Sequence, residues 1–216
     1  MQAILQETSI VVAGAWNPAI LTPAWILQHG VQSPDIQAHM VQAIFPAVLN
    51  GALDFPRFIL PGFTYSARPD VVILLPDALA QGSFETAENV FSRVLVQLNH
   101  TPIGGVGHNF EFRHPQAEND WLDPMNESQL SLVDAVDGWD VSRTTLATSF
   151  SNGNSVINIQ RYTEGATFVV KFNFHHPVTS AAAAQKVMVG DGYQRAWQNF
   201  QTARTIVKKL YGEIEP

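Results

Sequence analysis

A six-residue pattern, F-x-F-x-H-P, occurs twice in this chain and constrains its fold more than any other feature. It occupies Phe110–Pro115 and Phe172–Pro177. In both copies aromatic residues alternate with polar ones, with the period of two that a half-buried strand needs, and a proline then ends the strand. The two segments are therefore predicted to be core strands with a histidine where each strand ends. Because they lie in different local contexts, the repeat does not by itself indicate a duplicated domain.

The same alternation divides the side chains of both strands between two faces of a sheet. One face is aromatic and apolar, with histidines among its members. It holds His108, Phe110, Phe112 and His114 in the first strand, and Phe168, Val170, Phe172, Phe174 and His176 in the second. The opposite face is polar and holds Asn109, Glu111, Arg113, Lys171, Asn173 and His175.

The strand-end histidines are the candidates for a chemical site. If the two strands are neighbours, His114 and His176 would leave the sheet beside one aromatic layer. Together with His175 and a carboxylate from Glu111 or Glu118, they could form an acid–base or metal site. The sequence has no H-E-x-x-H or H-x-H spacing, however, and histidines at strand ends more often bond to backbone or solvent. We therefore expect no metal and no cofactor.

Size and composition bound the class of protein. With 216 residues and 46% hydrophobic residues, the chain can bury a large core. Its net charge of −7 and its 14% content of charged residues argue against binding to nucleic acid. The absence of cysteine excludes disulfides and thiolate metal sites. No apolar run reaches the length of a membrane span, and residues 10–15 lack the basic flank of a signal peptide, so we expect a cytoplasmic protein without membrane contact.

Turn and capping signals predict the order of the elements. Strands are expected over 9–16, 58–67 and 71–75, short helices over 18–48, a helix from Ser83, and a second capped helix over 126–138. A three-stranded meander is expected over 142–151, 155–163 and 167–175, followed by helices with a break at residues 190–192. The fold class is α+β, a mostly antiparallel sheet covered by helices, with a C-terminal meander and a long terminal helix.

Proline and charge suggest how the chain is organised. Eleven of the 13 prolines precede Met125, and residues 118–140 carry seven acidic residues but no Lys or Arg. The chain is expected to form a single compact unit over 1–216, with two subdomains as the finer alternative. These would be an N-terminal α/β part over 1–116 and the meander with its helix over 139–216, joined by the acidic segment 117–138. Acidic residues at the start of a capped helix are typical of a solvated face.

The terminal helix carries an apolar, largely aromatic stripe. Tyr193, Trp197, Phe200 and Tyr211 recur at helical spacing. We expect this stripe to pack across the meander, and the alternative is that the same aromatic residues form a subunit interface.

No motif in the sequence specifies a reaction. Gly104–Gly107 contains three glycines, but they follow a helix and precede a strand, the reverse of the order in a phosphate-binding loop. Neither G-x-S-x-G nor S-x-x-K is present. The sequence favours a non-enzymatic accessory or protein–protein interaction protein that self-associates as a homo-oligomer. The alternative is an enzyme or small-ligand binder with a pocket at the strand ends near His114 and His176.

Overall fold

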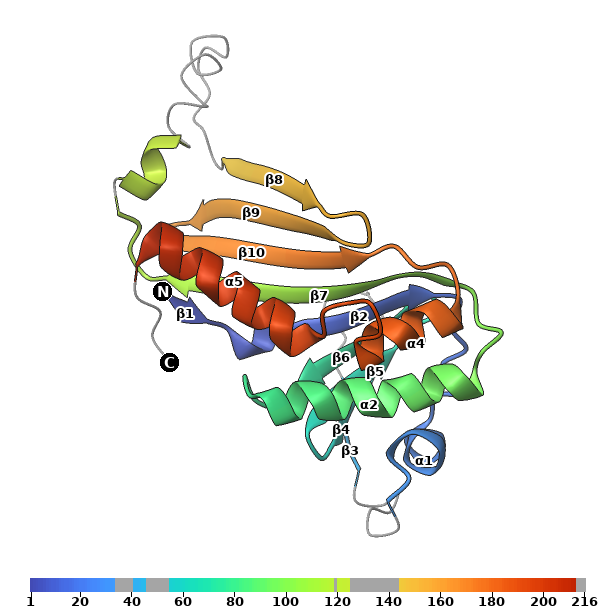
Figure 1. Cartoon of the computed structure of the whole chain (residues 1–216). Helices are drawn as coiled ribbons and strands as arrows, with labels where there is room; N and C mark the ends of the chain where they lie inside the picture. The colour runs from blue at the N-terminus through green and yellow to red at the C-terminus, as the bar shows by residue number, and fades with distance from the viewer. Residues whose placement is uncertain (34–40, 46–54, 119, 125–143, 213–216) are drawn as a thin grey trace, which may run out of the picture.

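The computed structural model describes residues 1–33, 41–45, 55–118, 120–124 and 144–212. Its strands form one antiparallel sheet in the spatial order β3-β4-β5-β6-β2-β7-β10-β9-β8, with the short β1 paired to β7 (Figure 1). The strands are β1 (Gln2–Ala3), β2 (Ser9–Gly14), β3 (Gln42–Ile44), β4 (Arg57–Leu60), β5 (Phe63–Ala67), β6 (Val71–Pro76), β7 (Ile103–His114), β8 (Thr145–Ser151), β9 (Val156–Glu164) and β10 (Thr167–His176).

Helices cover one face of this sheet, so the expected α+β class is confirmed. Figure 1 shows α2, α4 and α5 on the same side of the strands. They are α2 (Gln81–Gln97), α4 (Ala181–Val189) and α5 (Ala196–Tyr211), and a shorter α1 (Pro23–Ile26) continues into a π-helical turn at Leu27–Val31. As the Thr22-Pro23 signal predicts, the Thr22 hydroxyl accepts a hydrogen bond from the Trp25 N–H at the start of α1.

The aromatic face of the two repeat strands forms the centre of the core. Phe110 and Phe112 of β7, like Phe172 and Phe174 of β10, are at most 2% exposed. Phe200 of α5 packs on this layer, with its ring centroid 5.4 Å from that of Phe110. The terminal helix was expected to pack across the meander. Its Tyr211 does pack on Phe168 of the meander strand β10, whereas Phe200 packs on β7, the strand beside the meander. The meander β8-β9-β10 is also present, with glycines at positive φ in both of its turns.

Three local predictions need correction. The strand expected over 58–67 is a hairpin of β4 and β5, because Gly62 takes a φ of +91° and turns the chain beside Pro61. The stretch 18–48, expected to be helical, contains strand β3. Helix α2 begins at Gln81 rather than after Ser83, whose hydroxyl bonds to Asp77 instead of capping the helix.

Two other predictions cannot be compared with the structure. The helix expected over 126–138 lies outside the described residues. Most of the acidic segment 117–138 does so as well, and the division into two subdomains stays a prediction. Within the part of the chain that the structure describes, no helix is both long and apolar enough to cross a membrane.

The join between β2 and β7 depends on a glycine. A Cβ placed on Gly14 would lie 2.6 Å from the carbonyl oxygen of Pro102, an oxygen that also accepts a hydrogen bond from the Ala15 N–H. We expect Gly14→Ala to lower the free energy of unfolding by about 1–3 kcal/mol, because relieving the clash must shift the backbone. Urea denaturation measures this.

The matched control is Gly104→Ala in the adjacent strand, where the nearest atom to an added Cβ is 4.0 Å away. This control should be nearly neutral. Equal losses of stability in the two variants would contradict the steric explanation.

Candidate functional site

The structure separates the histidines that the sequence suggested as neighbours. Strands β7 and β10 are adjacent, but they run antiparallel, with His114 opposite Phe168 and His176 opposite Val106. The expectation that His114 and His176 share one end of the sheet is therefore wrong, because antiparallel pairing places the ends of the two strands at opposite edges. His114 instead bonds through Nδ1 to the backbone oxygen of Gln116.

The two remaining candidates, Glu111 and His175, lie on the face of the sheet away from α5. Glu111 is 2% exposed and is paired with Arg113 and with Lys171, whose Nζ lies 2.8 Å from its Oε2. His175 packs over Gly105, where an added Cβ would meet its ring at 2.7 Å. Neither side chain reaches the aromatic layer, so the four candidate residues do not form one site.

A different pair of histidines does meet, under α5. His108 of β7 and His176 of β10 are 0% and 1% exposed, and their ring centroids are 4.9 Å apart. The strand pairing explains this contact, since Phe174 lies opposite His108 and His176 is two residues further along the same face. The ring that His176 meets is thus that of His108 and not that of His114.

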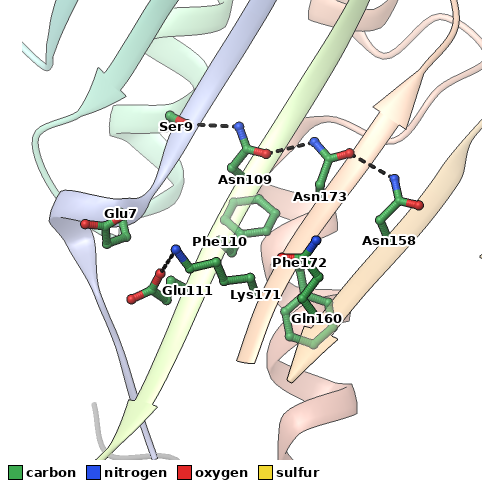
Figure 2. Close-up of a pocket in the computed structure, with 10 residues that line it drawn as sticks. All are labelled: Glu7, Ser9, Asn109, Phe110, Glu111, Asn158, Gln160, Lys171, Phe172 and Asn173. Carbon is green, nitrogen blue, oxygen red and sulfur yellow. Dashed lines mark hydrogen bonds and ion pairs between the residues drawn. The ribbon is translucent and has the colours of Figure 1, made fainter. Parts of the chain in front are cut away.

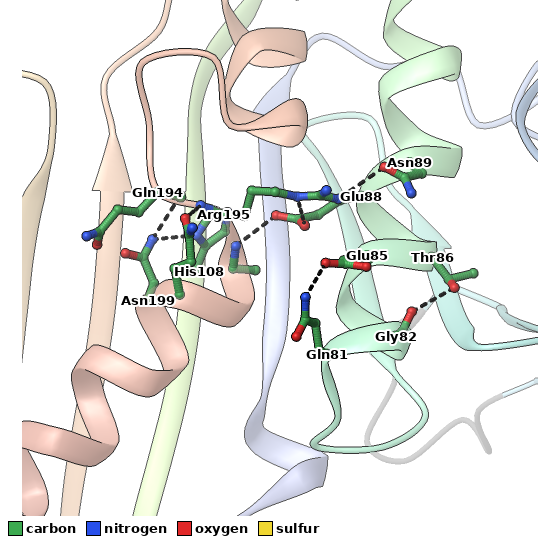
Figure 3. Close-up of polar contacts among 12 residues, drawn as sticks. Gln81, Gly82, Glu85, Thr86, Glu88, Asn89, His108, Gln194, Arg195 and Asn199 are labelled. Carbon is green, nitrogen blue, oxygen red and sulfur yellow. Dashed lines mark hydrogen bonds and ion pairs between the residues drawn. The ribbon is translucent and has the colours of Figure 1, made fainter.

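One asparagine links the two rings. Asn199 of α5 is 1% exposed, and its Nδ2 lies 2.8 Å from His108 Nδ1 (Figure 3). The same Nδ2 lies 3.4 Å from His176 Nε2. The other nitrogen of His176, Nδ1, lies 2.7 Å from Ser155 Oγ. Among the described residues His108 Nε2 is buried without a hydrogen-bond partner. The result is a polar chain Ser155–His176–Asn199–His108 inside the molecule.

Burial keeps both imidazoles uncharged at neutral pH. It is the main cause that lowers the pKa of His176 to about 4, and the neighbouring His175 adds a smaller effect in the same direction. Burial also lowers the pKa of His108 well below its ordinary value, assisted by His176. A neutral ring can accept one hydrogen bond and donate another. Among the described residues, His176 has a partner at both nitrogens, whereas His108 has one only at Nδ1.

This chain opens into a pocket of about 310 Å³, which we call the Ser155 pocket. It lies between the β8–β9 turn, the loop 190–194 and the start of α5. Its polar lining comes from Asn152, Asn154, Ser155, Gln194 and Asn199, and its apolar lining from Ile157, Phe174 and the ring of Tyr193. None of the described residues that line it has a charged side chain.

A buried ion pair positions the helix that carries Asn199. Glu88 of α2 is 0% exposed and accepts hydrogen bonds from Arg195 Nε and from the backbone N–H of Ala196, both at 2.8 Å (Figure 3). Burial raises the pKa of Glu88, while the Ala196 N–H and the Arg195 guanidinium act in the opposite direction. These bonds join α2 to the first turn of α5.

The open face of the sheet carries a row of three asparagines flanked by two serines, which we call the amide row. Ser9, Asn109, Asn173, Asn158 and Ser149 lie opposite one another on five adjacent strands and are joined by hydrogen bonds of 2.7–3.1 Å. Figure 2 shows four of them beside the Lys171–Glu111 pair. A shallow groove of about 350 Å³ lies over this row. Because each amide bonds to its neighbours, the row stabilises the sheet.

The proposed interface aromatics all contact the chain's own core. Phe200 is 2% exposed, and Trp197 packs on Phe84 with ring centroids 5.7 Å apart. Tyr193 contacts the His176 ring at 5.5 Å, and Tyr211 packs on Phe168 at 5.3 Å. Phe200 has almost no surface left for a partner, whereas the other three remain partly exposed.

Two of the residues that build this site could have been found from the sequence, because each is a polar residue on the apolar stripe of a helix. Asn199 lies between Ala196 and Ala203 on the apolar stripe of α5, and Glu88 lies beside Phe84 and Phe91 on that of α2. A polar residue on a buried helix face implies a buried partner. Ser155 gave no such signal. The described residues contain no group of three His, Cys, Asp or Glu side chains that could hold a metal ion.

Comparison of the chain with protein-family models, with curated proteins and with solved structures gave no match in any of the three, so the functional argument depends on the geometry described above.

Proposed function

We propose that the protein is a non-enzymatic protein–protein interaction protein that self-associates through the outer edge of β8. The observation that supports this proposal is that β8 is an exposed strand at the end of the sheet. β8 is the last strand in the sheet order, and all of its seven residues except Leu146 are exposed. Among the described residues, no strand pairs with its outer side. Its outward N–H and C=O groups can therefore pair with another strand.

The composition of β8 favours such pairing. Edge strands are usually protected by charged residues, by proline or by short length. β8 has the sequence TLATSFS, without a charge or a proline, and it runs for seven residues. It also exposes 55% of Phe150. A strand of this kind associates readily with a second strand of the same composition.

The occupant that best fits this edge is a second copy of the chain. Two β8 strands pairing antiparallel form a closed twofold dimer, whereas β8 pairing with the opposite edge β3 would give an open chain of molecules. β3 has only three residues. Because β8 is uncharged, two molecules of net charge −7 can meet there without opposing charges in the strands themselves.

A register centred on Thr148 brings the two large apolar residues of β8, Leu146 and Phe150, opposite each other. Phe150, Thr148 and Leu146 lie opposite Ile157, Ile159 and Arg161 of β9, on the face that the helices cover. Figure 1 shows that β8 lies beyond α5, outside the helix layer. With Thr148 on the twofold axis, Phe150 of one copy faces Leu146 of the other. The pairing thus extends the apolar layer across the dimer.

A charge at the axis tests this proposal. Thr148→Lys should raise the dimer dissociation constant by about tenfold or more, because two lysines would oppose each other at the axis. Light scattering across a dilution series measures the change. Val96→Lys is the control, since Val96 is 56% exposed on α2 and the substitution adds the same charge away from β8. A wild-type protein that stays monomeric at high concentration, or equal effects of both lysines, would overturn the proposal.

Crosslinking tests the register independently. The chain has no cysteine, so a single introduced thiol reports one contact. Under mild oxidation Thr148→Cys should give a disulfide-linked dimer, since opposed Cβ atoms in antiparallel strands lie about 4.5–5.5 Å apart. Val96→Cys should not. Dimer formation without a Thr148→Cys crosslink would exclude this register.

A further inference from the structure

The Ser155 pocket has the chemistry of a binding site for an uncharged ligand. Its polar side-chain groups are four carboxamides and the hydroxyls of Ser155 and Tyr193, which both donate and accept hydrogen bonds. No charged side chain of a described residue lines it, so an ionic ligand would enter without a counter-charge. Its volume of about 310 Å³ is at the lower end of the range for small-molecule sites.

The buried histidines fix the direction in which the Ser155 hydroxyl donates. We assign the proton of His176 to Nδ1, because its Nε2 faces the amide nitrogen of Asn199, a group that can only donate. His176 Nδ1 then donates to Ser155 Oγ at 2.7 Å. With one lone pair of Oγ engaged, the hydroxyl proton of Ser155 is free to bond to a ligand oxygen. Hydrogen bonds in such a chain strengthen one another.

The apolar part of the lining limits the class of ligand further. Ile157 and Phe174 contribute apolar surface, and Tyr193 contributes an aromatic ring whose position is fixed by its contact with His176. A sugar offers the matching combination, hydroxyl groups around its edge and a face of C–H groups. We propose that the Ser155 pocket binds a neutral sugar of monosaccharide or disaccharide size, with Ser155 donating to a ligand oxygen.

A defined set of probes tests this assignment on the full chain. Glucose, galactose, mannose, ribose and maltose are titrated and followed by saturation-transfer NMR, with glucuronate and glucose 6-phosphate as charged counterparts. At least one neutral sugar should bind with a Kd below about 20 mM, and its charged counterpart should bind about tenfold more weakly or worse.

Two variants assign the binding to this pocket. Ser155→Ala should raise the Kd about tenfold, because it removes the hydroxyl that His176 orients. Tyr193→Leu should raise it similarly by removing the aromatic surface. Ser149→Ala is the matched control, an identical substitution of an exposed serine in the amide row, and should leave the Kd unchanged. The proposal is overturned if no neutral sugar binds below that limit, if charged sugars bind equally well, or if Ser155→Ala and Ser149→Ala bind alike. Dimerisation through β8 is measured separately, so each result is independent of the other.

Discussion

Replacing Arg195 by methionine is expected to lower the free energy of unfolding by about 3–5 kcal/mol, because it leaves a buried carboxylate without its charged partner. Glu88 is 0% exposed, whereas Arg195 is 23% exposed in its side chain. Losing the arginine therefore leaves the more deeply buried charge unpaired. Methionine keeps much of the packing of the arginine stem, so the loss reports mainly the missing charge. Urea denaturation at pH 7 measures the difference.

Two variants separate the charge from other causes. Glu88→Gln combined with Arg195→Met should recover part of the loss, because glutamine can still accept from the Ala196 N–H but has no charge to bury. Lys209→Met, which removes an exposed positive charge near the end of the same helix, should change stability by only about 0.3–1 kcal/mol. If the double variant is no more stable than Arg195→Met, the loss comes from packing instead.

The pH dependence of Arg195→Met gives a further check. Burial already raises the pKa of Glu88, and removing the guanidinium, which acts against that rise, should raise it further. A carboxyl group whose pKa is higher in the folded than in the unfolded state takes up a proton more readily when folded. The stability deficit of Arg195→Met should therefore shrink as the pH falls through that raised pKa.

Alternation along the strands predicted which residues share a face, and the structure confirms it for both repeat strands. Phe110, Phe112, Phe172 and Phe174 are buried under α5, while Asn109 and Asn173 lie on the open face. A period of two is a local property of the backbone, so a single segment is enough to show it. The meander was also predictable from local signals, because short turns join its strands.

The pairing of distant strands could not be predicted in this way. β7 lies between β2 and β10, although more than 50 residues separate it from each of them along the chain. Nothing local shows that β7 and β10 run antiparallel, and that direction determines which histidines meet. The contact of His108 with His176, and with Asn199 of α5, follows from packing between elements that the sequence shows only separately.

Acidification is expected to destabilise the protein through these two histidines. The pKa of His176 is lowered from 6.5 to about 4 in the folded state, so the unfolded chain binds a proton more readily between those pH values. Above pH 6.5 this ring is neutral in both the folded and the unfolded state, so the free energy of unfolding is not reduced by its protonation. This free energy should fall by about 3 kcal/mol as the pH drops to 4, because the difference between the two pKa values sets the free energy of protonating the folded state. His108, whose pKa is also lowered, acts in the same direction.

A histidine variant isolates this contribution from the carboxylates that titrate in the same range. Glu88 titrates with the opposite sign, because its raised pKa favours the folded state on acidification. His176→Asn cannot become charged, so the stability difference between wild type and this variant should shift by about 3 kcal/mol in favour of the variant between pH 6.5 and 4. His100→Asn, at an exposed position, is the control for the substitution itself. If wild type and His176→Asn lose stability in parallel on acidification, protonation of His176 does not destabilise the folded protein. The folded protein would then accommodate this ring in its charged form.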